Sequence, residues 1–124
     1  MNDLDTILNN IWKDQCAIVG RQSVRDLLSA IDQGRNPEQA FISMEGGADF
    51  DYSTTVSLLV QAVTLIKLTV DVYEKLRSSL RRKPTESEIS SAAEGELRSM
   101  NESLKRVAGK LPQVAHELVQ LRSN

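Results

Sequence analysis

Cys16 and His116 are the only cysteine and the only histidine in the chain, and together they could supply a nucleophile and its general base. That chemistry needs the imidazole within hydrogen-bond reach of the thiol. The surrounding pattern predicts a half-buried Cys16 beside the apolar stripe of an N-terminal helix, and His116 on the surface of a C-terminal helix. We therefore expect neither residue to be catalytic, and we expect the chain not to be an enzyme.

The segment from Asp49 to Ser53 is similar to the start of a calcium-binding loop. Such a loop needs glycine at its sixth position and glutamate at its twelfth, and the chain has Thr54 and Val60 there. A zinc site would need carboxylates at spacings that the sequence does not offer. The glycine pair 46–47 lacks the lysine of a phosphate-binding loop. We expect no metal and no cofactor.

Two positively charged features could attract anions. The segment 20–23 could offer backbone amides at a helix start near Arg21 and Arg25, but most helix starts could do the same. The stronger feature is a basic run that could bind nucleic acid or phosphate, in which the candidate residues are Arg77, Arg81, Arg82 and Lys83. The chain has a pI of about 5.4 and no aromatic residue within the run, so nucleic-acid binding is not favoured. We expect these cations mainly to complement the dipole at a helix end.

Composition and charge indicate a folded protein. The chain has 124 residues, of which 40% are hydrophobic and 26% are charged. The net charge of −2 combines −5 in residues 1–52, from nine acids and four bases, with +3 in residues 53–124, from eight acids and eleven bases. The N-terminus lacks the pattern of a signal peptide, and a lone cysteine cannot form an internal disulfide, so we expect a cytoplasmic location. The uncharged stretch 52–66 is too short for a membrane span.

Helical periodicity and capping residues organise the first half of the chain. Apolar spacing predicts a helix from Asn2 or Asp3 to Gly20, and a second from Ser23 to a left-handed Gly34. The Asn36-Pro37 pair predicts a third, short helix that ends near Met44. The acidic, glycine-containing stretch 45–52 is expected to be a loop.

One long helix is predicted from Ser53 or Thr54 to about Arg82, because no Gly, Pro or Asn interrupts its apolar periodicity. It carries two apolar stripes, so we expect neighbours on more than one side. Thr85 and Glu88 form a capping box that starts the next helix. Its heptad rhythm continues through Leu121, past Gly109 and Pro112. The last segment is therefore either a kinked continuation of that helix or a separate short helix on the same seam.

These patterns predict an all-α fold, a five- or six-helix bundle built on a long antiparallel helical hairpin of residues 54–82 and 86–108 or further. We expect a single domain, 1–124, with short helices in 1–44, a loop at 45–52 and the hairpin in 53–124. The function that the pattern favours is a protein–protein interaction module, either a homo-oligomer or a subunit or adaptor of an assembly. Its coiled-coil-like seam, serving the core or a partner, comprises Val56, Leu59, Val63, Ile66, Val70, Tyr73, Leu97, Met100, Leu104 and Leu118.

Overall fold

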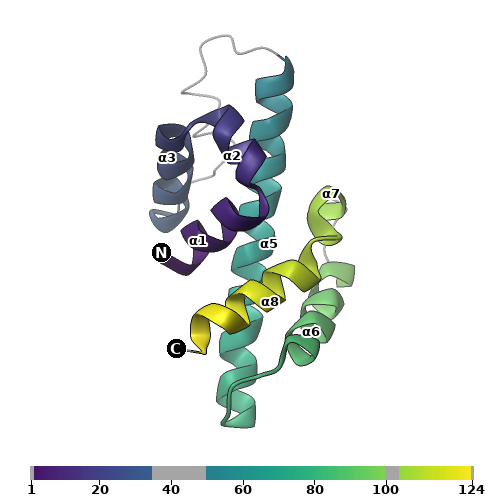
Figure 1. Ribbon diagram of the computed structural model, residues 1–124. Helices are drawn as coiled ribbons and strands as arrows, with labels where there is room; N and C mark the ends of the chain where they lie inside the picture. Colours follow the sequence, from purple (N-terminus) through teal and green to yellow (C-terminus); the bar gives the residue numbers. More distant parts are fainter. Residues whose placement is uncertain (1, 35–49, 100–103, 124) are drawn as a thin grey trace.

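A computed structural model of the protein describes residues 2–34, 50–99 and 104–123. Within these ranges the chain is helical and contains no strand, which confirms the all-α prediction (Figure 1). The described helices are α1 (Asn2–Ile11), α2 (Lys13–Val19), α3 (Arg21–Asp32), α5 (Phe50–Leu80), α6 (Glu86–Ser99), α7 (Lys105–Ala108) and α8 (Leu111–Arg122). The helix predicted at 36–44 and most of the loop predicted at 45–52 lie outside the described residues.

The long helix α5 is one uninterrupted element of 31 residues, as predicted, and spans about 45 Å. It begins at Phe50, a few residues before the predicted start, because aspartate is as favourable in the first turn of a helix as in a turn. It ends at Leu80. Arg81 then adopts a left-handed conformation with φ 59°, which a non-glycine residue rarely takes up.

Five of the described helices pack against α5, which is the axis of the molecule, and α3 packs against α2 (Figure 1). In the N-terminal part of the chain, α1 and α2 contact α5. In the C-terminal part, α6, α7 and α8 contact it. The helix α8 also contacts both α1 and α6. It therefore joins the first part of the chain to the last.

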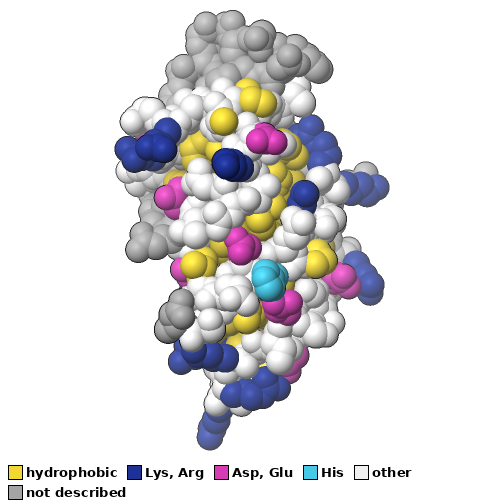
Figure 2. All heavy atoms as spheres, in the orientation of Figure 1, with side chains coloured by type: hydrophobic (Ala, Val, Ile, Leu, Met, Phe, Trp, Pro, Cys, Tyr) yellow, Lys and Arg dark blue, Asp and Glu magenta, His cyan; other side chains and the backbone are white. Residues whose placement is uncertain are grey.

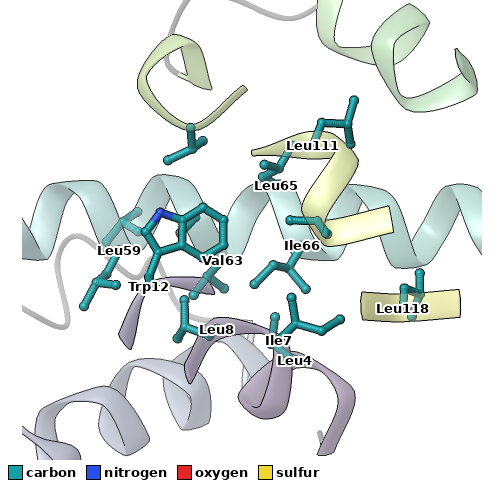
Figure 3. Packing of buried hydrophobic residues seen from close by; sticks show 14 of the residues in the cluster. Leu4, Ile7, Leu8, Trp12, Leu59, Val63, Leu65, Ile66, Leu111 and Leu118 are labelled. Atoms are coloured by element: carbon teal, nitrogen blue, oxygen red, sulfur yellow. The ribbon is translucent and has the colours of Figure 1, made fainter. Parts of the chain in front are cut away.

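A single cluster of buried side chains runs through these contacts. Leu59, Val63 and Ile66 on α5 face Ile7 and Leu8 of α1 (Figure 3). The second apolar stripe of α5 is also covered, since Ala62, Leu65 and Val72 are at most 5% exposed. The two stripes that predicted neighbours for the long helix are thus covered, over its central part, by other helices of the same chain.

The segment predicted as one helix up to Gly20 is two helices, because the chain bends at Trp12 (φ −111°, ψ 43°). The bend places the indole, 3% exposed, beside Leu59 and Val63 in the core (Figure 3). Gly20 does end this part, with φ 98°, and Gly34 is left-handed, with φ 74°, as predicted. The next helix, α3, starts directly at Arg21 rather than after Ser23.

The C-terminal part differs from an extended hairpin. The helix α6 ends at Ser99, and α8 is a separate helix with Pro112 in its first turn. The chain reverses between them, and α8 packs against α6 as well as against α5 (Figure 1). Of the two alternatives for the last segment, the separate helix is therefore correct. The shared rhythm arises because α6 and α8 each bury one face in a common core. The structure describes seven helices, because the segment up to Gly20 is divided at Trp12 and the segment predicted as one helix over 86–108 is divided into α6 and α7.

The predicted capping box at the start of α6 is present. The Glu88 backbone N–H donates to Thr85 Oγ1 at 3.2 Å, and the Thr85 backbone N–H donates to Glu88 Oε1 at 2.9 Å. We expect Thr85→Ala to lower the free energy of unfolding by about 1 kcal/mol, because one helix-start amide loses its acceptor. Urea denaturation measures this change. Thr85→Ser keeps the hydroxyl and is the control, and equal losses for both variants would contradict a capping role.

Candidate functional site

The residues predicted to form a seam lie mainly in the core of the chain. Leu59, Val63, Ile66, Tyr73, Leu104 and Leu118 are between 0% and 4% exposed. Val70 and Leu97 are partly buried against the same cluster. Met100 and the side chain of Val56 lie outside the described residues. The buried members of this seam are covered by the chain itself, so a surface for a partner has to be sought elsewhere.

Cys16 and His116 do not form a catalytic pair, because they line different hollows of the surface. Cys16 is 6% exposed, and its Sγ lies 3.9 Å from the Leu8 carbonyl oxygen. Burial, with a smaller contribution from the Asp5 carboxylate, raises the pKa of the Cys16 thiol to about 11. At neutral pH only on the order of one molecule in ten thousand carries the reactive thiolate.

His116 lies at a junction of α1, α6 and α8 (Figure 2). Its Nδ1 is hydrogen-bonded to Glu86 Oε1. Beside it, the Asn10 side-chain amide donates to Glu117 Oε1 at 2.7 Å. Both interactions join helices far apart in the sequence, and more than half of the His116 side chain is exposed. These two pairs connect helices at the surface, and the lining of this hollow contains no cysteine, serine or threonine.

The four predicted anion-binding residues are exposed and lie in the last turn of α5 and in the connection to α6. Figure 2 shows Lys and Arg side chains at the lower end of the molecule. Two of the four predicted residues are engaged within the chain. The Arg82 guanidinium donates to both carboxylate oxygens of Glu88, at 2.9 and 2.8 Å. The Lys83 ammonium donates to the Arg122 carbonyl oxygen at 2.8 Å, at the C-terminal end of α8. Arg77 and Arg81 have no ion-pair partner among the described residues. Lys83 thus lies at the C-terminal end of α8, where a helix dipole favours a cation, and not only at the end of α5 as expected from the sequence.

The Glu88 carboxyl provides a pH-dependent test of its pairing with Arg82. Hydrogen bonds from Arg82, and then from Thr85, lower the pKa of the Glu88 carboxyl from 4.5 to about 2. A lowered pKa in the folded state stabilises the protein above the unfolded pKa, and this contribution is lost as the pH falls from about 4.5 towards 2. We expect an NMR titration to show the low midpoint, and Arg82→Gln to move it upward. A midpoint that Arg82→Gln leaves unchanged would contradict the pairing.

A groove between α1, α2 and α3 is a second hollow that an incoming ligand could use. It has a volume of about 610 Å³, which lies within the range of roughly 300–1,000 Å³ typical of binding pockets. We call it the N-terminal groove. It is lined by Asp5, Asn9, Asn10, Lys13, Cys16, Ala17, Arg21, Val24 and Arg25. Gly20 allows α3 to follow α2 directly, which brings residues of both helices to one groove.

The N-terminal groove is electropositive within an acidic part of the chain. Residues 1–52 contain four basic residues, and three of them, Lys13, Arg21 and Arg25, line this one groove. All three are exposed, and none forms an ion pair in the part of the chain that the structure describes. They face a single carboxylate in the groove, that of Asp5, whose Oδ1 accepts a hydrogen bond from the Asn9 amide at 2.8 Å.

The helix α2 also exposes apolar side chains. Ile18 is 58% exposed, the larger of the two values for exposed large hydrophobic residues in the described ranges; the other is Leu80 at 37%. The neighbouring Ala17, which lines the groove, is also exposed. Isolated exposed aliphatic residues are common, but an apolar pair at the margin of a groove offers area that a partner could bury.

Sequence reasoning did not identify this groove. Arg21 and Arg25 are four residues apart and therefore share one helix face, and both were considered as neighbours of a helix start. Lys13 could not be added, because its position relative to them depends on the bend at Trp12 and on the turn at Gly20. The end of the helix at Gly20 is marked by the glycine, but the bend at Trp12 has no local signal in the sequence.

Other kinds of site find no support in residues 2–34, 50–99 and 104–123. No group of three or more His, Cys, Asp or Glu side chains there is arranged to hold a metal ion. No helix of this part combines the length and the apolar character needed to cross a membrane. Comparisons with protein-family models, curated proteins and solved structures give no match. The functional argument therefore rests on the surface of the chain itself.

Proposed function

We propose that the chain is a non-enzymatic helical module for protein–protein interaction in the cytoplasm, acting as a homo-oligomer or as a small subunit or adaptor of a larger assembly. The observation that carries the proposal is the exposed apolar edge of α2, where Ile18 is 58% exposed and follows Ala17, which lines the N-terminal groove. Burying the rest of such a side chain at an interface is worth about 1 kcal/mol. The groove beside it provides the concave surface that a partner segment needs.

The chemistry of the polar groups supports an interaction role over an enzymatic one. The thiol of Cys16 is buried and has a raised pKa, and His116 is occupied by Glu86. Neither residue lies with the other in a common cleft. A module that binds a protein needs neither group to be activated.

Nucleic-acid binding through the basic end is the weaker alternative. Arg82 and Lys83 are engaged with Glu88 and with the Arg122 carbonyl, which leaves Arg77 and Arg81 as cations without an ion pair in the described ranges. Two exposed cations neutralise too few phosphates for strong binding, since affinity grows with the number of phosphate contacts.

Self-association is tested first, with sedimentation velocity over a wide concentration range. If the module is a homo-oligomer, Ile18→Glu shifts the equilibrium towards monomer, because a carboxylate would have to be buried in the interface. Leu80→Glu is the matched control, since it places the same charge on another exposed aliphatic position at the far end of α5. Equal effects of the two variants would contradict an interface at α2.

If the wild type is monomeric, a photo-crosslinking amino acid at position 18 tests the subunit or adaptor role in the native cell, with position 80 as the control. We expect one defined protein to be captured from position 18 and not from position 80. A monomer that captures nothing from position 18 would overturn the proposed function.

A further inference from the structure

We propose that the N-terminal groove docks an acidic segment of a partner protein, with Lys13, Arg21 and Arg25 contacting its carboxylates. This inference rests on the proposed function and specifies the chemistry of the partner. The groove would bind a chain segment through charge complementarity at its rim and through apolar contact at its floor. Each part of that statement follows from the residues that line it.

The first argument is the convergence of unpaired positive charge. The basic residues come from α2 and α3, although the first 52 residues carry nine acids and only four bases. Two nearby acids are hydrogen-bonded to amides and not to these cations, since Asp5 accepts a hydrogen bond from Asn9 and Asp26 accepts one from Gln22 at 3.1 Å. A guanidinium can bind a carboxylate through two parallel hydrogen bonds, which makes arginine well suited to this role.

The second argument concerns the floor and the remaining polar groups. Cys16 and Val24 are 6% and 3% exposed and lie under the rim, with the exposed methyl group of Ala17 beside them. A small apolar side chain of a peptide can pack on such a floor. The Asn9 amide is engaged with Asp5, since it donates to the backbone oxygen and to Oδ1, each at 2.8 Å. The Asn10 amide donates to Glu117 Oε1 at 2.7 Å, and its second hydrogen can donate to a peptide carbonyl.

The third argument favours a peptide over a nucleic acid. A phosphate backbone is best met by a long, continuous basic stripe in a basic domain. The groove instead has three cations, an aspartate in its lining and an acidic surrounding, with −5 over residues 1–52. A segment of a few acidic residues alternating with small apolar ones matches this mixture of charge and apolar floor better than a polyanion does.

Isothermal titration calorimetry of the full chain at low salt tests the proposal, with a synthetic peptide in which Glu and Asp alternate with Ala and Leu. We expect saturable binding to the wild type, and binding weakened at least about tenfold by Lys13→Glu with Arg25→Glu, because two attractive pairs become repulsive. Lys67→Glu with Lys75→Glu is the matched control. It changes the net charge by the same amount at exposed positions of α5.

A milder double variant, Lys13→Gln with Arg25→Gln, keeps the test valid if charge reversal unfolds the helices; it is expected to weaken binding by an intermediate factor. Backbone amide shifts should change mainly in residues 9–25. No binding, or equal weakening by the α5 control, would overturn the proposal. Tighter binding of a single-stranded oligonucleotide or of inorganic phosphate, lost in the same variants, would also overturn it. If position 18 captures a partner while the acidic peptide does not bind, the module stands and the acidic partner is rejected.

Discussion

Replacing Trp12 by alanine is expected to lower the free energy of unfolding by about 3–5 kcal/mol, the largest effect of any single change considered. The indole is 3% exposed and lies between the N-terminal helices and α5, next to Leu59 and Val63 (Figure 3). Its removal would leave a large cavity at the point where α1 gives way to α2. The helices on either side are too short, at ten and seven residues, to hold their positions without this packing.

Urea denaturation followed by far-UV circular dichroism measures this effect, since the variant has no tryptophan fluorescence. Trp12→Phe fills part of the cavity and is expected to lose clearly less stability. Ile18→Ala is the surface control on α2, because that side chain is 58% exposed and a change there alters little packing. A loss below about 1 kcal/mol for Trp12→Ala would contradict the central position of the indole.

At Trp12 the structure differs from the helix predicted from the sequence. The apolar spacing around it fits one helix up to Gly20, and no Pro or Gly marks a break. The bend coincides with burial of the indole beside Leu59 and Val63 of α5. Local patterns cannot show this burial, since it depends on the shape of a core built from distant residues.

The elements that were predictable are those whose signals are local. The uninterrupted periodicity of α5, the left-handed Gly34 and the capping box of Thr85 and Glu88 each depend on residues a few positions apart. The reversal between α6 and α8 was left open because the heptad rhythm runs through it unchanged. The heptad spacing of apolar residues shows that each helix buries one face, but it does not show whether the two helices run in the same direction.

The same limit applies to the candidate site. The seam residues were chosen because apolar stripes must be covered, but pattern alone cannot tell whether the cover is the same chain or another. In the structure α1 and α8 cover Ile66, and α2 lies along the first half of α5. The surface available to a partner consists of side chains that remain exposed, such as Lys13 and Arg25. Their proximity depends on two bends that the sequence only partly marks.

The second large effect is expected at Leu118, because α8 joins both parts of the molecule. Leu118 is 0% exposed, and its helix contacts α1, α5 and α6. Near its end, the Arg122 guanidinium pairs with Asp3 and with Glu74, each at 2.8 Å. We expect Leu118→Ala to lower the free energy of unfolding by about 3 kcal/mol, since a buried leucine leaves a cavity that rigid neighbours fill only in part.

Hydrogen exchange tests whether this loss reaches the whole chain. If α8 couples the N-terminal helices to α6, protection in Leu118→Ala falls together in α1 and in α6, because opening either one exposes the same shared core. Leu121→Ala removes the same atoms from a partly buried position on α8 and should cost roughly 1 kcal/mol. Protection that falls in α6 while α1 keeps its wild-type value would mean that the two parts unfold independently. In that case the N-terminal groove could be ordered by α1, α2 and α3 without help from the C-terminal helix.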